Sequence, residues 1–398
     1  MSAAGVKGAC TGRLRTWSCA EVGEGEAVDC WCWSGIVAGV TSAVTLKDVA
    51  RLAGVHAGTA SKALNPLTRK GVSDRTVQAV LEAARQLGYF PDPIARSLRT
   101  NRSNVVGIIL PDLTNPMFPP AVRGIEDALR EAGYTALVAN TDQDLVREEE
   151  IFRAMRGRRV DGFIIATARR VHPLLRHAAD DGVAVVQLNR VTDDPRIPAV
   201  LVDDAAGVTQ AVEHLVSLGH AHLAHLSGPA DVSTAESRMQ SFLAACRRHG
   251  SAVTDPVVIT CESYSVDAGA AATETLLRKH PECTAIVAGN DLIALGAYRM
   301  LAKSGRHIPA DVSVIGFNDM PFVDMLEPPL TTVHVPQYHL GVESARLLLE
   351  RLRDDGAPAK RLLLPSNLIV RGSTGPAPQR QSSTPARKSR RRAASSSS

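Results

Sequence analysis

Between residues 104 and 373 the chain alternates short apolar runs with amphipathic segments, and this alternation limits its possible folds more than any other feature. Runs such as 105–111 and 312–318 are rich in Val and Ile and have the length of buried strands. The segments 121–134 and 147–160 repeat apolar residues at helical spacing. Such alternation predicts parallel sheets with helices on both faces. The units are too numerous for one sheet, so we expect an α/β fold of two doubly wound lobes whose facing strand ends bind a ligand.

A shorter segment upstream, residues 45–88, has a wholly helical pattern. Thr45, with Asp48 three residues later, predicts a helix start of the capping-box type, with Asp in place of the usual Glu or Gln. Gly54 fits a tight turn that requires a positive φ, and a second helix follows it. A third helix is expected to end at the C-cap signal Gly88. Two helices joined by a glycine turn and packed on a third are typical of helix-turn-helix modules.

Basic residues are concentrated in this helical part of the chain. Residues 45–103 hold ten basic and four acidic side chains, a net charge of +6, whereas the whole chain of 398 residues carries only +4. A positive module suits the phosphate backbone of nucleic acid. The alternating segment that follows is acidic, so only the helical module is expected to bind nucleic acid. A three-helix bundle with no role on DNA is the alternative, and the coincidence of turn and charge argues against it.

The motifs VTLKDVARLAGV, TASKALN and ARSL resemble the DNA-binding headpiece and hinge of the LacI/GalR (lactose-repressor) family of transcription regulators. The motifs DLTNPMF, VDGFII, HLVSLGH, GNDLIALGA and VIGFND resemble the family's effector domain, which has the two-lobed fold of periplasmic binding proteins. The resemblance implies a headpiece at 45–91, a hinge helix at 92–103, and an effector-binding and dimerisation domain at 104–373.

The same resemblance implies a function and a set of partners. The chain is expected to be a transcriptional repressor that is not an enzyme, needs no cofactor and acts in the cytoplasm on the nucleoid. Its expected partners are double-stranded operator DNA, a small sugar-like effector and a second copy of the chain, in a homodimer or a higher oligomer without membrane association. Whether the effector releases or promotes DNA binding is left open by the sequence.

The resemblance further implies which headpiece residues contact DNA: Thr45, His56, Ala57, Gly58, Thr59, Ser61, Lys62 and Asn65. The family's two main base-reading positions hold Ala57 and Gly58, which offer no hydrogen bond to a base, so Lys62 is the remaining polar reader. Phosphate contacts are expected from Thr45, Thr59, Ser61 and Asn65. His56 stands where Ser is usual, and we expect it to be a poorer N-cap for the second helix.

The hinge helix follows Pro91 and is too short to be stable alone. In the family this helix folds against its dimer mate in the minor groove of the DNA. Ala95 and Leu98 are the expected DNA contacts here, and Leu98 falls where a leucine wedges between base pairs and kinks the duplex. The alternative for Leu98 is an ordinary linker leucine.

The resemblance implies eight effector contacts: Met117, Phe118, Asn189, Arg190, Arg238, Asn290, Asp291 and Asn318. Arg238 is expected to bind hydroxyls or a carboxylate with its planar guanidinium. The alternative is that Arg238 caps a helix or pairs with Glu236 on the surface. Asn318 stands where many members of the family carry Asp. Because an amide both donates and accepts hydrogen bonds, the resemblance does not name a particular sugar.

The two ends of the chain share neither the helical pattern of the headpiece nor the strand and helix alternation of the effector domain. Residues 1–44 contain four of the seven cysteines, but Cys30 and Cys32 are too close together for a zinc knuckle. A signal peptide is a second interpretation, and four acidic residues between the arginines and the apolar run argue against it. We expect a disordered extension or an upstream start site there. The tail, 374–398, is basic and of low complexity, and we expect it to be disordered with weak non-specific affinity for DNA.

Other functional classes have weaker support. The histidines His214, His220, His222 and His225 could suggest a metal site, but their spacing does not place them on one helix face, so we expect a surface turn and strand without metal. The sequence contains no GxSxG, HExxH or P-loop motif for an enzyme on a doubly wound fold. A secreted sugar-binding protein would share the two lobes, and the headpiece argues against it.

Overall fold

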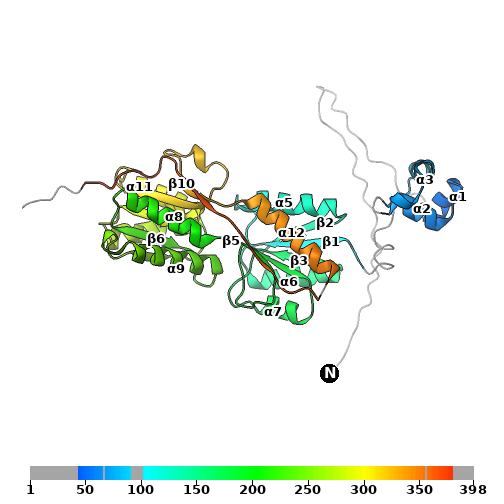
Figure 1. Ribbon diagram of the computed structural model, residues 1–398, viewed down its shortest axis with the longest axis horizontal. Coiled ribbons are helices and arrows are strands. Elements are labelled where there is room, and N and C mark those ends of the chain that lie inside the picture. Colours follow the sequence, from blue (N-terminus) through cyan, green and yellow to red (C-terminus); the bar gives the residue numbers. More distant parts are fainter. Residues whose placement is uncertain (1–43, 66–67, 91–101, 355, 380–398) are drawn as a thin grey trace, which may run out of the picture. The chain divides into compact units, whose positions relative to one another are not determined.

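The structure, a computed structural model, describes residues 44–65, 68–90, 102–354 and 356–379 (Figure 1). The chain divides after Phe90 into two compact units, a small helical one and a large α/β one. The expected hinge-helix contacts Ala95 and Leu98 lie outside the described residues, as do residues 1–43 and 380–398.

The described part of the small unit, which we call the headpiece, contains three α-helices and a short 3-10 turn. Their bounds are α1 Leu46–Leu52, α2 Ala57–Leu64, η1 Arg69–Gly71 and α3 Asp74–Leu87. The local signals of the sequence act as predicted: the Asp48 carboxylate accepts a hydrogen bond from the backbone nitrogen of Thr45 at 3.0 Å. Gly54 has φ +67° in the turn between α1 and α2, and Gly88 has φ +62° at the end of α3. Both values lie in the left-handed region that favours glycine.

The core of the headpiece consists of small apolar side chains. Val49, Ala60, Ala63 and Val80 are fully buried where the three helices meet. Alanines at the helix contacts allow close approach, so the unit buries a continuous core despite its short helices. The solvent-facing side of α2 is left to other residues, among them the exposed Lys62.

The large unit has two lobes, each built on a six-stranded sheet. In lobe 1 the strand order is β11-β5-β4-β3-β1-β2, and all the pairs are parallel. The lobe 1 strands are β1 Val105–Leu110, β2 Thr135–Asn140, β3 Gly162–Ile165, β4 Val185–Leu188, β5 Ala199–Val202 and β11 Arg361–Leu364. Its helices are α5 Phe118–Glu131, α6 Leu145–Gly157, α7 Pro173–Asp180 and α12 Gln337–Arg353. β3 and β4 are buried along their whole length, as expected for strands covered on both faces.

Lobe 2 repeats the arrangement with the strand order β12-β10-β9-β8-β6-β7. Only the β10–β12 pair at its edge is antiparallel. The lobe 2 strands are β6 Leu223–Ser227, β7 Val257–Thr260, β8 Ala285–Ala288, β9 Ser313–Asn318, β10 Thr331–His334 and β12 Asn367–Ile369. Its helices are α8 Asp204–Ser217, α9 Ser233–Arg248, α10 Val266–Lys279 and α11 Asp291–Lys303, with short 3-10 turns at Gly250–Ala252 and Val323–Met325. The predicted fold class is confirmed.

The chain passes between the lobes three times. It leaves lobe 1 after β5, returns after β10 to form α12 on lobe 1, and leaves again between β11 and β12 (Figure 1). Two of these crossings are tied together, because the Ser366 hydroxyl donates a hydrogen bond to the Asp203 carbonyl at 2.7 Å. Three adjacent connections restrict the relative motion of the lobes to bending and twisting at this hinge.

Some element bounds differ from those expected. Helix α5 begins at Phe118, three residues before the predicted start, because Pro119 and Pro120 occupy its first turn, where a missing N–H costs nothing. The packed chain also continues past residue 373, where we expected the tail to begin. The Ala377 backbone nitrogen donates to the Leu218 carbonyl at 2.9 Å, which holds this segment on lobe 2.

The histidines of the suspected cluster serve this packing. His214 Nε2 lies 2.9 Å from the Thr374 hydroxyl, and His220 Nε2 lies 3.0 Å from the Gly375 carbonyl. His220 is buried rather than exposed on a surface turn, whereas His225 lies on strand β6 as expected and is also buried. Burial lowers the pKa of His225 to about 4, so its ring is neutral. In the described ranges no group of three or more His, Cys, Asp or Glu side chains is placed to hold a metal ion.

A close helix crossing in lobe 1 gives a test of this packing. A Cβ atom added to Gly341 of α12 would lie 1.9 Å from the Ala121 carbonyl oxygen of α5. We predict that Gly341→Ala lowers the free energy of unfolding by about 1–3 kcal/mol, because the two backbones must separate. Thermal unfolding of the full chain measures the loss.

The matched control is Gly157→Ala at the end of α6, where an added Cβ meets nothing within 4 Å. This variant should be neutral or gain a few tenths of a kcal/mol, since alanine restricts the unfolded chain. A Gly341→Ala protein that melts at the same temperature as wild type would show that the crossing is looser than described.

Candidate DNA interface and effector site

His56 and Gly58, at the start of α2, are exposed. His56 is the N-cap of this helix, and its Nδ1 accepts a hydrogen bond from the Gly58 backbone nitrogen at 3.1 Å. His56 therefore does cap α2, with its ring nitrogen in place of the usual hydroxyl oxygen. With Nδ1 accepting, the ring proton of the neutral form is on Nε2, which becomes a donor.

The other expected DNA residues differ in their availability. Lys62 is exposed, and no ion pair or side-chain hydrogen bond joins its ammonium to the described part of the chain. Gly58 is also exposed, whereas Ala57, Thr59, Ser61 and Asn65 are partly buried. The Thr45 hydroxyl donates to Asp48 at 2.6 Å, so it is partly engaged within α1. The exposed edge of α2 thus presents Lys62 and His56 as its two nitrogen donors.

A pocket of about 280 Å³ of empty space, part of it open to solvent, lies between the two lobes of the large unit. Its described lining residues are Asn115, Met117, Phe118, Asn189, Arg190, Thr234, Arg238, Tyr264, Asn290 and Asn318. The lobe 1 residues come from the start of α5 and the end of β4, and the lobe 2 residues come from the ends of β7, β8 and β9 and from α9. Seven of the eight expected effector residues meet here, at the facing strand ends.

Two strand ends at this pocket have unusual backbone conformations. Asn189 has φ +65° directly after β4, and Asn318 has φ +118° at the end of β9. Residues other than glycine are strained in this region of φ, and such strain is concentrated at functional sites. The Oδ1 atoms of both asparagines are buried without a hydrogen-bond partner in the structure. Unsatisfied buried acceptors cost free energy that a bound hydroxyl would recover.

Arg238 is the most enclosed charged group of the pocket, with only 2% of its surface exposed. Its Nε donates to Asp204 at 2.8 Å and its Nη1 donates to the Gly289 carbonyl at 2.6 Å. The guanidinium carbon lies 3.7 Å from the centre of the Phe317 ring. Nη2 has no partner in the structure. The alternative of a surface pair with Glu236 is excluded, and the NH2 group of Nη2 remains for a ligand.

Asp291 does not line the pocket. Its Oδ1 accepts from the Thr332 hydroxyl at 2.6 Å and its Oδ2 accepts from the Met320 backbone nitrogen at 2.8 Å. It is fully buried, and burial raises the pKa of its carboxyl group to about 7. Both oxygens are used to join α11 to the neighbouring strands. The adjacent Asn290 does line the pocket and caps α11 through its Oδ1, which accepts from Ile293 N at 2.9 Å.

Three lining residues were not expected from the sequence: Asn115, Thr234 and Tyr264. The hydroxyls of Thr234 and Tyr264 lie 3.0 Å apart and form one hydrogen-bonded pair. Tyr264 comes shortly after β7, so the rule that ligands bind at the carboxyl ends of strands could have indicated it. Asn115 belongs to the motif DLTNPMF, which already pointed to this loop.

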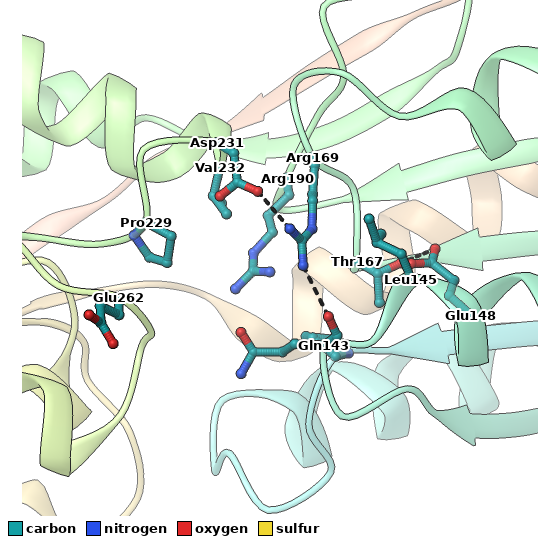
Figure 2. Close-up of a pocket in the computed structure, with 11 residues that line it drawn as sticks. Gln143, Leu145, Glu148, Thr167, Arg169, Arg190, Pro229, Asp231, Val232 and Glu262 are labelled. Atoms are coloured by element: carbon teal, nitrogen blue, oxygen red, sulfur yellow. Dashed lines mark hydrogen bonds and ion pairs between the residues drawn. The ribbon is translucent and has the colours of Figure 1, made fainter.

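A second compartment, with about 420 Å³ of empty space, adjoins the pocket and shares Arg190 with it (Figure 2). Here the lobes are joined directly, because Arg169 Nη1 of lobe 1 lies 2.8 Å from Asp231 Oδ2 of lobe 2. The other end of the same guanidinium donates to the Gln143 carbonyl at 3.0 Å. The Arg170 backbone nitrogen also crosses between the lobes, donating to the Asp231 carbonyl at 2.9 Å. These contacts hold the lobes in the arrangement seen.

Glu148 is buried in the wall of this compartment, where it accepts a hydrogen bond from the Thr167 hydroxyl at 2.5 Å (Figure 2). Burial raises the pKa of the Glu148 carboxyl to about 7, although Thr167 and the charge of Arg169 act to lower it. His172 Nε2 lies 3.5 Å from the same carboxyl group. Burial lowers the pKa of His172 to about 4, so its ring is neutral at physiological pH.

Comparison with known proteins identifies the family. Residues 45–92 match the bacterial regulatory proteins of the lacI family. Residues 103–371 match the periplasmic binding proteins and sugar binding domain of the LacI family. The ribose operon repressor of Halalkalibacterium halodurans is 34% identical over 83% of this chain and 97% of its own length. The transcriptional repressor CytR of Escherichia coli is 31% identical over 84% of this chain and 97% of its own.

Solved structures agree with the sequence comparison. The lac repressor dimer bound to operator and the anti-inducer ONPF superposes with a TM-score of 0.73 at 28% identity, covering 84% of this chain and 99% of that one. The complex of the transcriptional regulator CelR with cellobiose gives a TM-score of 0.64 at 31% identity, covering 83% and 99%.

These matches define a two-domain bacterial regulator, a helix-turn-helix unit followed by a two-lobed binding unit. The chain belongs to the LacI family of DNA-binding transcriptional regulators. Because the relatives are transcriptional repressors, the expectation that the chain is not an enzyme is confirmed. Within the described ranges, no helix has the length and apolar character that crossing a membrane requires.

The pKa of Glu148 gives a pH-dependent prediction. Its value of about 7 lies above the 4.5 of an ordinary glutamate, so the carboxyl group stabilises the fold below pH 4.5 and this contribution is lost as the pH rises through 7. We therefore predict that Glu148→Gln gains thermal stability relative to wild type on going from about pH 5.5 to about pH 8. The difference in melting temperature at the two pH values is the measurement.

Glu150→Gln, a change at an exposed position on the same helix, is the matched control and should show the same difference from wild type at both pH values. If the difference in melting temperature between Glu148→Gln and wild type is also the same at about pH 5.5 and about pH 8, the Glu148 carboxyl does not titrate between these two pH values.

Proposed function

We propose that this chain is a repressor that binds a near-palindromic operator as a homodimer and is switched by a small polar effector in the pocket between its lobes. The main support is that one chain contains both an exposed helix-turn-helix edge and a pocket for a polar ligand. Three buried polar atoms of this pocket have no hydrogen-bond partner: Asn189 Oδ1, Arg238 Nη2 and Asn318 Oδ1. The relatives support it, since one is a ribose operon repressor and another was solved as a dimer on operator. The site of action is then the cytoplasm, at the nucleoid.

In this proposal α2 enters the major groove and reads bases with few polar groups. Ala57 and Gly58 offer only small surfaces, which let the helix approach the base edges closely. Lys62 and the Nε2 donor of His56 are the candidates for hydrogen bonds to acceptors such as guanine N7 and O6. Thr45, Thr59, Ser61 and Asn65 position the helix on phosphates, and Ala95 and Leu98 of the hinge helix contact the minor groove.

The switch would depend on the hinge between the lobes. An effector that bonds to Asn189 of lobe 1 and to Arg238 and Asn318 of lobe 2 has contacts that exist together in only one arrangement of the lobes. A ligand shifts an equilibrium only through its different affinity for the two states. Bridging contacts of this kind supply that difference, and the three chain crossings at the hinge transmit it.

The operator itself gives the first test of this proposal. A symmetric dimer reads a two-fold site, so selection from random DNA should return near-palindromes. Affinity should fall steeply between low and moderate salt, because phosphate contacts release counterions. A selected site without two-fold symmetry, or an affinity that does not change with salt, would contradict the proposal.

Lys62 gives a second test, aimed at base reading. Lys62→Ala should flatten the preference at one base pair of each half-site, because a good side-chain contact to a base is worth about 1–3 kcal/mol. The measurement is the affinity for the selected operator and for its single-base variants. Arg85→Ala is the control, since Arg85 is exposed on α3 and paired with Glu82. An equal loss on all sequences would make Lys62 a phosphate contact instead.

A further inference from the structure

Arg190 is the one arginine lining these two compartments whose charge has no paired carboxylate among the described residues. Its guanidinium forms no hydrogen bond or ion pair with any described residue, and its recorded contact is with the Tyr264 ring, whose centre lies 5.4 Å away. Figure 2 shows the guanidinium reaching into the open middle of the cleft. Burial lowers the pKa of Arg190 from its usual value, although Tyr264 and Asp231 act to raise it, so the site disfavours the cation while no ligand is bound.

The other two arginines of the cleft are already paired. Arg169 lies 2.8 Å from Asp231, and Arg238 lies 2.8 Å from Asp204. Each pair is locally neutral and is fixed by further hydrogen bonds. Arg190 is therefore the unpaired cation at the point where the two compartments meet.

No carboxyl group near the cleft forms an ion pair with Arg190 among the described residues, although the charge of Asp231, which is paired with Arg169, offsets it in part. Glu148 is buried, and its pKa of about 7 keeps a large part of it protonated at neutral pH. Glu262 is exposed at the rim of the second compartment and forms no ion pair with Arg190 within the described residues. Asp291 has both oxygens committed to Thr332 and Met320.

The smaller pocket is rich in amides and guanidinium groups. Among its described lining residues there are four asparagines and two arginines, and no carboxylate. The atoms of this pocket that lack a hydrogen-bond partner are of two kinds. Arg238 Nη2 is a donor and requires an acceptor, whereas the Oδ1 atoms of Asn189 and Asn318 are acceptors and require donors. Hydroxyl groups satisfy all three, since a hydroxyl both donates and accepts.

From these observations we propose that the effector is a polyol that carries one anionic group, a carboxylate or a phosphate ester. Its hydroxyls bind Asn189, Asn318 and Arg238, and its anionic group binds Arg190 at the junction of the two compartments. Charge-assisted hydrogen bonds to a planar guanidinium are about twice as strong as neutral ones, and the geometry of Arg suits both anions. This inference rests on the proposed effector-controlled function and narrows its ligand to one chemical class.

The experiment compares matched sets of ligands on the full chain by isothermal titration calorimetry. One set is ribose, ribonate and ribose 5-phosphate, and the other is glucose, gluconate and glucose 6-phosphate. In at least one set an anionic member should bind about tenfold or more tightly than the neutral parent sugar. The carboxylate and phosphate arms decide between the two sources of charge.

Variants assign the preference to Arg190. Arg190→Gln should remove the preference for the anion, whereas Arg190→Lys should keep part of it, because the charge remains but the bidentate geometry is lost. Arg176→Gln is the matched control, since Arg176 is an exposed arginine on α7 that lines neither compartment. It should bind every ligand as wild type does.

Three results would overturn the inference: neutral sugars that bind as tightly as their anionic partners, a preference for the anion that survives in Arg190→Gln, or no binding of either kind at millimolar concentration. Operator binding by the same preparations separates this outcome from failure of the proposed function. A protein that binds its palindromic operator and responds only to neutral sugars keeps the proposed function and loses this inference. A protein that binds no operator loses the proposed function itself.

Discussion

The buried pair of Arg238 and Asp204 connects the effector pocket to the hinge between the lobes. Asp204 is the first residue of α8 and directly follows Asp203, whose carbonyl accepts the Ser366 hydroxyl of another chain crossing. Arg238 is held by Asp204, by the Gly289 carbonyl and by the Phe317 ring. A ligand that binds the free Nη2 of Arg238 therefore acts on a side chain whose partner, Asp204, is the residue next to Asp203 at the hinge. Removing one partner of such a pair would leave a buried charge uncompensated, so the pair is also essential to the fold of lobe 2.

The rim of the cleft has a second set of contacts, which join the two lobes directly. Arg169 and Asp231 join the lobes directly, and the Arg170 backbone adds another bond between them. The lobes can thus approach one another without an effector, held by groups of their own. An effector changes the balance only by adding contacts in one arrangement that are absent in the other. The unpaired Arg190, in the middle of the cleft, is where such a contact would have the largest electrostatic effect.

The features that could be predicted from the sequence are those set by local signals or by position at a strand end. The Thr45 and Asp48 pair, Gly54 and Gly88 depend on their own neighbours in the chain, and the structure confirms each of them. The alternation of strands and helices was sufficient to predict two doubly wound lobes. Seven of the eight effector residues that the family resemblance implied line one pocket. Three of them, Asn189, Asn290 and Asn318, lie at or just after the carboxyl ends of strands, where the sequence also predicted a ligand site.

The features that could not be predicted depend on contacts between distant parts of the chain. Helix α12 follows strands of lobe 2 but packs on lobe 1, and no local pattern states which lobe a helix will cover. Asp291 and its neighbour Asn290 were both expected to contact the effector. The carboxylate oxygens of Asp291 instead accept hydrogen bonds from Thr332 and Met320, which lie far along the chain. His56 was expected to cap poorly because hydroxyls and carboxylates are the usual caps, whereas its ring nitrogen reaches the Gly58 N–H.

Thermodynamic linkage gives the most direct measurement of the central claim, that the pocket between the lobes controls binding to DNA. If the effector changes operator affinity by some factor, saturating operator must change effector affinity by the same factor. Calorimetric titration of the effector into the full chain, with and without its selected operator, measures this directly. We predict two different dissociation constants whose ratio equals the ratio of operator affinities with and without effector. If the effector binds equally tightly to free and operator-bound protein, the pocket does not control binding to DNA.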